Sequence, residues 1–214
     1  MRYQAVIFDL DGVICHTDEY HYLAWKQIAD RLQIPFNPAI NHRMRGIDRM
    51  ASLDVLLGQT CRDFSRQEKE RIAEEKNAMY RQLLNNLSPA SVSPDVMETL
   101  NSLRSAGLKL AIGSSSKNTK YILERIGLLD FFEAIADGTT VKHAKPDPEV
   151  FLQAAEKVGV SPEKCLVVED ARSGVLAAMA AGMDSAAIGE AAESGLATYR
   201  LESISELLRL IATD

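Results

Sequence analysis

Short β-rich runs alternate with helical patterns along most of the chain, and this alternation limits the folds available to it most strongly. The expected strands are 3–8, 108–112, a weaker run at 131–135, 165–168 and 185–188. The expected helices are roughly 94–106, 118–127, 147–159, 173–182 and 204–211. Four of them end at glycines, as helix C-termini often do: Gly107, Gly127, Gly159 and Gly182. The pattern predicts an α/β fold with helices on both faces of a Rossmann-like parallel sheet.

The alternation is interrupted once, between the first strand and the helix that starts near residue 94. Residues 15–90 show helical patterns at roughly 18–32, 49–57 and 65–85 but no convincing strand. They hold 11 Lys/Arg and 10 Asp/Glu, a net charge of +1, whereas the rest of the chain carries −7. We therefore expect two domains: a catalytic core of residues 1–14 and 91–214, and an inserted all-helical cap of residues 15–90.

Composition and charge exclude several classes of protein. With 46% hydrophobic and 25% charged residues, the chain is neither disordered nor of low complexity. No apolar stretch approaches the ~20 residues of a membrane helix, and a net charge of −6 argues against nucleic-acid binding. Three widely spaced cysteines, Cys15, Cys61 and Cys165, are expected to be free thiols. We expect a soluble cytoplasmic protein, a monomer because no long exposed apolar stripe stands out.

Polar residues follow the strands at the edge where an open α/β sheet binds its ligands. Asp9 and Asp11 end the first strand, Glu169 and Asp170 end the fourth, and Lys145 lies in a loop. Each carboxylate alone could simply end a strand or cap a helix. Four together would repel one another unless a cation joins them, and hard oxygen ligands suit Mg²⁺. The set therefore predicts a magnesium site.

The same residues predict phosphoryl transfer. A carboxylate such as Asp9 can attack phosphorus and form an aspartyl phosphate, while Lys145 and a metal ion hold the phosphoryl oxygens. Asp11, two residues after Asp9, can stay clear of the metal and face the leaving group of the substrate, which suits a general acid/base. The turn at 114–118 opens a helix and can bind a phosphate, although on its own it would only be a polar turn capped by Asn118.

These motifs resemble those of the haloacid dehalogenase superfamily, in the same order and over most of the chain. The motifs are Asp9-Leu10-Asp11-Gly12, Ser114, Lys145 and Glu169-Asp170. The resemblance implies Mg²⁺-dependent catalysis by Asp9 as nucleophile, Asp11 as acid/base, and the further catalytic residues Ser114 and Lys145. It also implies metal ligation by Asp9, the carbonyl of Asp11, Glu169 and Asp170, and a helical cap. Asp11 disfavours the dehalogenase branch, which lacks it.

Residues 11–21 with Trp25, residues 45–52 and residues 114–118 resemble the β-phosphoglucomutase family more narrowly. Members interconvert β-glucose 1-phosphate and glucose 6-phosphate through β-glucose 1,6-bisphosphate. The resemblance implies a phosphomutase of carbohydrate metabolism, transiently phosphorylated on Asp9. Arg45 stands where many members carry lysine, and His16 where an acid is common. The implied substrate-binding residues are Thr17, His21, Arg45, Gly46, Ile47, Arg49, Ser52, Lys76, Ser115, Ser116, Lys117 and Asn118.

Several residues have a second interpretation from their local pattern. Arg49, expected to bind the distal phosphate, lies in a basic run that could be solvated. Thr17 fits an N-cap of the helix at 18–32, His21 fits a packed core histidine, and Lys76 fits an exposed helix lysine. Cys15 is expected to be inert.

Two other functions compete with the mutase. A sugar-phosphate phosphatase of the same fold would share every core residue and differ only in its cap. A non-catalytic phosphate-binding protein is disfavoured by the complete set of Asp9, Asp11, Lys145 and Asp170.

Overall fold

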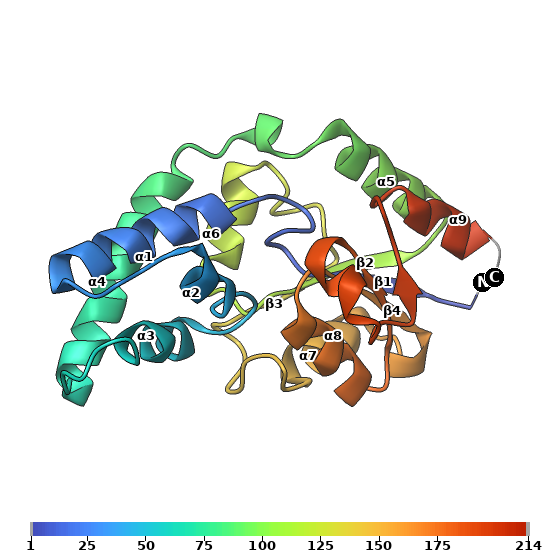
Figure 1. Ribbon diagram of the computed structural model, residues 1–214. Helices are drawn as coiled ribbons and strands as arrows, with labels where there is room; N and C mark the ends of the chain where they lie inside the picture. The colour runs from blue at the N-terminus through green and yellow to red at the C-terminus, as the bar shows by residue number, and fades with distance from the viewer. Residues whose placement is uncertain (1, 213–214) are drawn as a thin grey trace.

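A computed structural model describes residues 2–212 and shows one parallel sheet of six strands in the order β3-β2-β1-β4-β5-β6 (Figure 1). The parallel sheet with flanking helices confirms the predicted fold class. β1 lies between β2 and β4, where the strand order reverses, so the carboxyl ends of β1 and β4 are adjacent. The strands are β1 Ala5–Phe8, β2 Lys109–Gly113, β3 Ala134–Ala136, β4 Cys165–Glu169, β5 Asp184–Ala187 and β6 Tyr199–Arg200.

Alternate residues of the sheet build two apolar layers, as the two-residue period of a strand requires. Val6 and Phe8 of β1 pack in a cluster with α5 (Pro94–Ser105), α6 (Thr119–Arg125) and α9 (Glu206–Ala212). Ala5 and Ile7 pack on the other face with α7 (Glu149–Val158) and α8 (Arg172–Ala180). Burial of both faces explains why the central strands read as continuous apolar runs.

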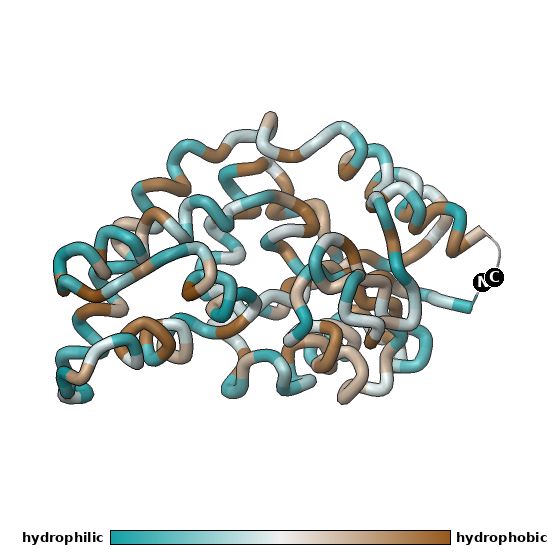
Figure 2. Tube along the Cα trace, in the orientation of Figure 1, coloured by the Kyte–Doolittle hydropathy of each residue, from teal (hydrophilic) through white to brown (hydrophobic). Residues whose placement is uncertain are grey.

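Four helices occupy residues 18–84: α1 Asp18–Leu32, α2 Pro38–His42, α3 Arg49–Leu57 and α4 Arg66–Leu84 (Figure 1). They share an apolar cluster of their own that includes Trp25, Leu53 and Ile72, and the trace alternates between hydrophilic and hydrophobic residues along α1 and α4 (Figure 2). We call these four helices with their loops the cap. Its exact bounds at 15–90, and the core of 1–14 and 91–214, stay predictions; residues 1, 213 and 214 lie outside the described part.

Several details differ from the expected elements. β3 begins three residues later than predicted, because residues 131–133 form a turn and a bend from which Phe132 packs with its ring centroid 6.3 Å from that of Phe8. α2 and β6 were not predicted because five and two residues are too short to show a period. The 3₁₀ segments are η1 Pro89–Ser91, η2 Pro162–Lys164 and η3 Gly189–Ser194.

Other expectations are confirmed. All four predicted helix-ending glycines have positive φ, and the cysteines are free thiols. Burial raises the pKa of Cys15, consistent with an inert thiol. Among residues 2–212, no helix combines the length and the apolar character needed to cross a membrane.

Candidate active site

The ends of β1 and β4 bring three carboxylates and one lysine together. Lys145 Nζ lies 2.5 Å from Asp9 Oδ1 and 2.6 Å from Glu169 Oε1, and all three side chains are buried. Burial alone would lower the pKa of Lys145, but the two carboxylates outweigh it and raise that pKa. The lysine is therefore a fixed positive charge beside Asp9.

Asp170 completes a compact group of oxygen ligands. Single ligand oxygens of Asp9, Glu169 and Asp170 all lie within 4.8 Å of one another. Burial raises the pKa of Glu169 and Asp170, and for Asp170 the neighbouring carboxylates raise it further. The absence of a side chain at Gly174 keeps this arrangement possible, since a Cβ there would lie 1.7 Å from Glu169 Oε1. Buried, crowded carboxylate oxygens fit a small hard cation such as Mg²⁺.

Asp11 lies apart from this group, with different partners. The Thr17 hydroxyl donates to its carboxylate, and the Tyr80 hydroxyl lies 2.9 Å from Thr17 Oγ1. A hydroxyl carries one proton, so Tyr80 donates to Thr17 in turn. Burial and the Asp9 charge raise the pKa of Asp11 to about 7, against the lowering effect of Thr17. Thr17 occupies the predicted N-cap position of α1, but its hydroxyl is bonded to Asp11 and makes no side-chain cap hydrogen bond to the helix.

Lys76 of α4 is buried inside the cap rather than exposed, which corrects the alternative interpretation. Its Nζ lies 2.8 Å from His21 Nδ1, and over the rings of Trp25 and Tyr80 at 5.1 and 4.4 Å from their centroids. Burial and Arg49 lower the pKa of Lys76 to about 7. Burial and Lys76 likewise lower the pKa of His21, so the imidazole is neutral and accepts from the lysine.

The turn after β2 faces the cap. Ser116 and Asn118 donate backbone N–H groups to the hydroxyls of Ser114 and Ser116, each at 3.2 Å. Asn118 makes no side-chain cap to α6; its amide donates to Asn77 of α4 at 2.9 Å. The Ser115 hydroxyl is buried without a hydrogen-bond partner among the described residues.

A cavity of about 570 Å³ lies between the core and the cap, and nearly all the predicted site residues line it. Every predicted catalytic, substrate-binding and metal-binding residue lines it except Thr17, which lies behind Asp11. The lining residues from the cap include Arg49, the first residue of α3, and Ser52, whose hydroxyl donates to the Asp48 carbonyl at 2.9 Å. They also include Gly46 and Ile47 from the loop before it.

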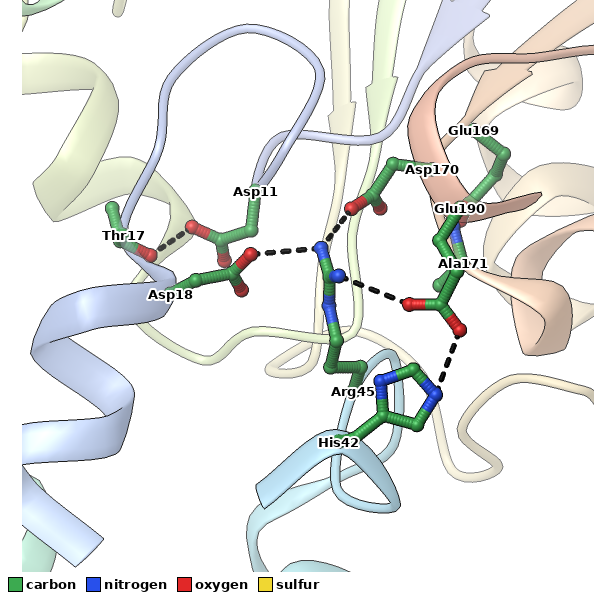
Figure 3. A network of polar contacts seen from close by, with 9 residues as sticks. All are labelled: Asp11, Thr17, Asp18, His42, Arg45, Glu169, Asp170, Ala171 and Glu190. Atoms are coloured by element: carbon green, nitrogen blue, oxygen red, sulfur yellow. Dashed lines mark hydrogen bonds and ion pairs between the residues drawn. The ribbon is translucent and has the colours of Figure 1, made fainter. Parts of the chain in front are cut away.

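Arg45 connects the cap to the acidic group. Its Nη2 lies 2.8 Å from Asp18 and 2.7 Å from Asp170, and its Nη1 lies 3.1 Å from Glu190 (Figure 3). These carboxylates outweigh partial burial and raise the pKa of Arg45. Close by, the Ser173 hydroxyl donates to the Gly46 carbonyl at 3.2 Å.

Among the site residues that sequence reasoning missed, four make polar contacts with predicted ones. Asp18, Asn77 and Tyr80 line the cavity, and Glu190 holds Arg45 from outside it. Tyr80 could have been found, because it lies four residues after Lys76 and so on the same helix face. Glu190 carries no such local signal.

Comparisons with known proteins identify the family of this chain. The family model described as haloacid dehalogenase-like hydrolase matches residues 3–182. The β-phosphoglucomutase of Bacillus subtilis (strain 168) is 42% identical over 189 residues, 87% of this chain and 84% of that protein. The phosphorylated carbohydrates phosphatase of Thermotoga maritima is 33% identical over 184 residues, 85% of this chain and 82% of that protein.

Among solved structures, a β-phosphoglucomutase from Clostridium difficile superposes with a TM-score of 0.92 at 36% identity, covering 99% of this chain and 96% of that one. Proteins of this kind use Mg²⁺ for phosphoryl transfer. The chain therefore belongs to the haloacid dehalogenase-like hydrolase family, in the group that contains the β-phosphoglucomutases.

Proposed function

We propose that this chain is a phosphomutase that interconverts β-glucose 1-phosphate and glucose 6-phosphate through β-glucose 1,6-bisphosphate. The observation that carries the proposal is the cavity that Asp9 and Lys145 of the core line together with Lys76 and Arg49 of the cap. A mutase needs two cationic ends, one for the reacting phosphate and one for the distal phosphate. The 42% identity to a β-phosphoglucomutase supports the choice of sugar.

Asp9 is the proposed nucleophile. One of its carboxylate oxygens attacks phosphorus of the bisphosphate, the bond from phosphorus to the sugar oxygen breaks, and Asp11 gives its proton to that oxygen. In the other direction the phosphoryl group leaves Asp9 for a sugar hydroxyl, and Asp11 takes the hydroxyl proton. A pKa of about 7 keeps both forms of Asp11 populated at neutral pH, as a group that acts both as acid and as base requires.

Magnesium would be held by the buried carboxylates of Asp9, Glu169 and Asp170, which fit the ion, and the family resemblance adds the carbonyl of Asp11. When bound, it supplies positive charge to the phosphoryl oxygens. Lys145 adds a second charge from its position against Asp9. Ser114 is proposed to contribute its hydroxyl to the same oxygens.

Residues of the cap and of the turn after β2 would hold the remainder of the substrate. Arg49, Ser116, Lys117 and Asn118 line the side of the cavity proposed for the distal phosphate. The unpartnered hydroxyl of Ser115 is available to a ligand, since buried polar groups rarely stay without a partner. The remaining proposed contacts come from Thr17, His21, Arg45, Gly46, Ile47, Ser52 and Lys76.

Enclosure separates a mutase from a phosphatase of the same fold, because water that reaches phosphorylated Asp9 would hydrolyse it. Hydrogen bonds between Asn77 and Asn118 and between Gly46 and Ser173 join the cap to the core. These contacts favour transfer to the sugar over transfer to water.

Replacement of the nucleophile tests the assignment. Asp9→Asn should abolish turnover while sugar-phosphate binding, measured by calorimetry, is retained. Asp95→Asn, at an exposed position in the first turn of α5, is the control and should keep full activity. Full turnover in Asp9→Asn would refute the role of Asp9.

A further inference from the structure

Among the residues that the structure describes, Glu190 forms ion pairs with two residues of the cap. Its carboxylate lies 3.1 Å from Arg45 Nη1 and 2.9 Å from His42 Nε2 (Figure 3). His42 ends α2, and Arg45 follows in the loop toward α3. One carboxylate of the core thus holds both ends of a four-residue stretch of the cap.

The position of Glu190 is fixed by the proposed metal site itself. It belongs to η3, which follows β5. Two residues near it, one before and one after, form backbone hydrogen bonds to the end of β4. Ile188 donates its N–H to the Glu169 carbonyl at 2.8 Å, and Ala191 donates to the Asp170 carbonyl at 3.0 Å. Ala191 is also buried in a small apolar cluster. The backbone therefore presents Glu190 at a defined place beside the acidic group.

The position of Glu190 determines how the Arg45 guanidinium is held. Its Nη2 lies between Asp18 and Asp170, and Nη1 is held by Glu190. A guanidinium is planar, so contacts on both nitrogens fix its orientation as well as its position. With Glu190 removed, Nη2 alone would connect Arg45 to the core.

We propose that Glu190 is a positioning residue for cap closure. By binding Arg45 and His42 together, it docks residues 42–45 against the core and orients the Arg45 guanidinium at the edge of the phosphoryl-transfer site. This inference rests on the proposed function for its catalytic consequence, the exclusion of water from phosphorylated Asp9. Its structural consequence, docking of the α2 segment, is independent of the reaction.

Glu190→Gln removes the charge and keeps the size of the side chain. The matched control is Glu193→Gln in the same η3 segment, where the carboxylate pairs with Arg200 of the core at 2.7 Å. Two measurements are made on both variants and the unmodified enzyme. Hydrogen exchange of the amides of residues 38–47 reports docking, with α4 as internal reference. The ratio of inorganic phosphate to sugar-phosphate product, with KM and kcat, reports water exclusion.

Glu190→Gln should raise exchange in residues 38–47 by about two- to fivefold, the range expected for loss of a half-exposed ion pair. The fraction lost as inorganic phosphate and KM should rise by a similar factor, with kcat for transfer little changed. Glu193→Gln should match the unmodified enzyme. His42→Asn, which removes one of the two contacts, should move the same quantities in the same direction by a smaller factor.

Equal exchange and equal phosphate release in Glu190→Gln and Glu193→Gln would overturn the proposal. If the unmodified enzyme makes no glucose 6-phosphate, the proposed function fails, and the exchange measurement still decides whether Glu190 docks the cap. Increased exchange without any change in phosphate release would refute the link to water exclusion.

Discussion

Lys76→Met tests the electrostatics of the cap interior. The lysine is only 2% exposed, and its neighbours are His21 and two aromatic rings rather than a carboxylate. Its pKa falls to about 7 in the folded chain, against about 10.4 in an unfolded one. At about 1.4 kcal/mol per pKa unit, holding the charged lysine inside the cap costs between 4 and 5 kcal/mol, an order-of-magnitude figure.

The sign of the pH dependence follows from the direction of that shift. Below pH ~7 Lys76 is protonated in both the folded and the unfolded chain, so the folded chain carries the whole free-energy cost of the buried charge. Between pH ~7 and ~10.4 the unfolded state alone binds the proton, so the stability of the unmodified protein rises with pH. Methionine never bears this cost. Lys76→Met should therefore be more stable than the unmodified protein at pH 6, and this advantage should shrink by about 2–3 kcal/mol by pH 9.

Urea unfolding of the ligand-free protein at pH 6, 7.5 and 9 measures this difference. Lys120→Met, at an exposed position of α6, is the control, and its free energy of unfolding should stay within about 0.5 kcal/mol of the unmodified value at each pH. A difference between Lys76→Met and the unmodified protein that is the same at all three pH values would refute the reasoning. Lys76→Met should also lose mutase activity, since it removes a charge from the cavity.

Three further substitutions test the cap contact, the buried ion pairs and the proposed acid/base. Gly46→Ala places a Cβ 2.3 Å from a side chain of α8 at positive φ, so KM and inorganic phosphate release should rise at least about tenfold; Gly107→Ala, also at positive φ but with open space, should leave both unchanged. Lys145→Met leaves buried carboxylates unpaired and should abolish turnover and lower stability by about 3–5 kcal/mol, measured by thermal unfolding. Thr17→Val removes the hydrogen bond that lowers the pKa of Asp11, so that pKa should rise. In the direction in which Asp11 acts as base, the acidic limb of the pH profile of kcat/KM should therefore move to higher pH. An unchanged limb would contradict the assignment of Asp11 as the acid/base.

The sequence predicted the sheet and its polar edge because both depend on local patterns. Asp9, Glu169 and Asp170 directly follow apolar runs, and adjacent parallel strands bring such ends together. The predicted start of β3 is three residues too early, because Phe131 and Phe132 resemble strand residues in sequence. In the structure Phe132 packs against the sheet from the turn before β3. Only tertiary packing distinguishes the two cases.

The contacts that close the cavity could not be predicted in the same way. Glu190 lies 145 residues from Arg45 in sequence, in a 3₁₀ segment without a period. The burial of Lys76 was also hidden, because α4 is rich in charged residues and the lysine read as one of its exposed positions. Such contacts depend on how the cap sits on the core.

The central claim is that phosphorylated Asp9 transfers its group to sugar and not to water. Phosphorus NMR of the purified protein with Mg²⁺, β-glucose 1-phosphate and a trace of the 1,6-bisphosphate tests it most directly. We expect a growing glucose 6-phosphate signal with little inorganic phosphate. Inorganic phosphate as the main product would contradict the mutase assignment and identify a sugar-phosphate phosphatase.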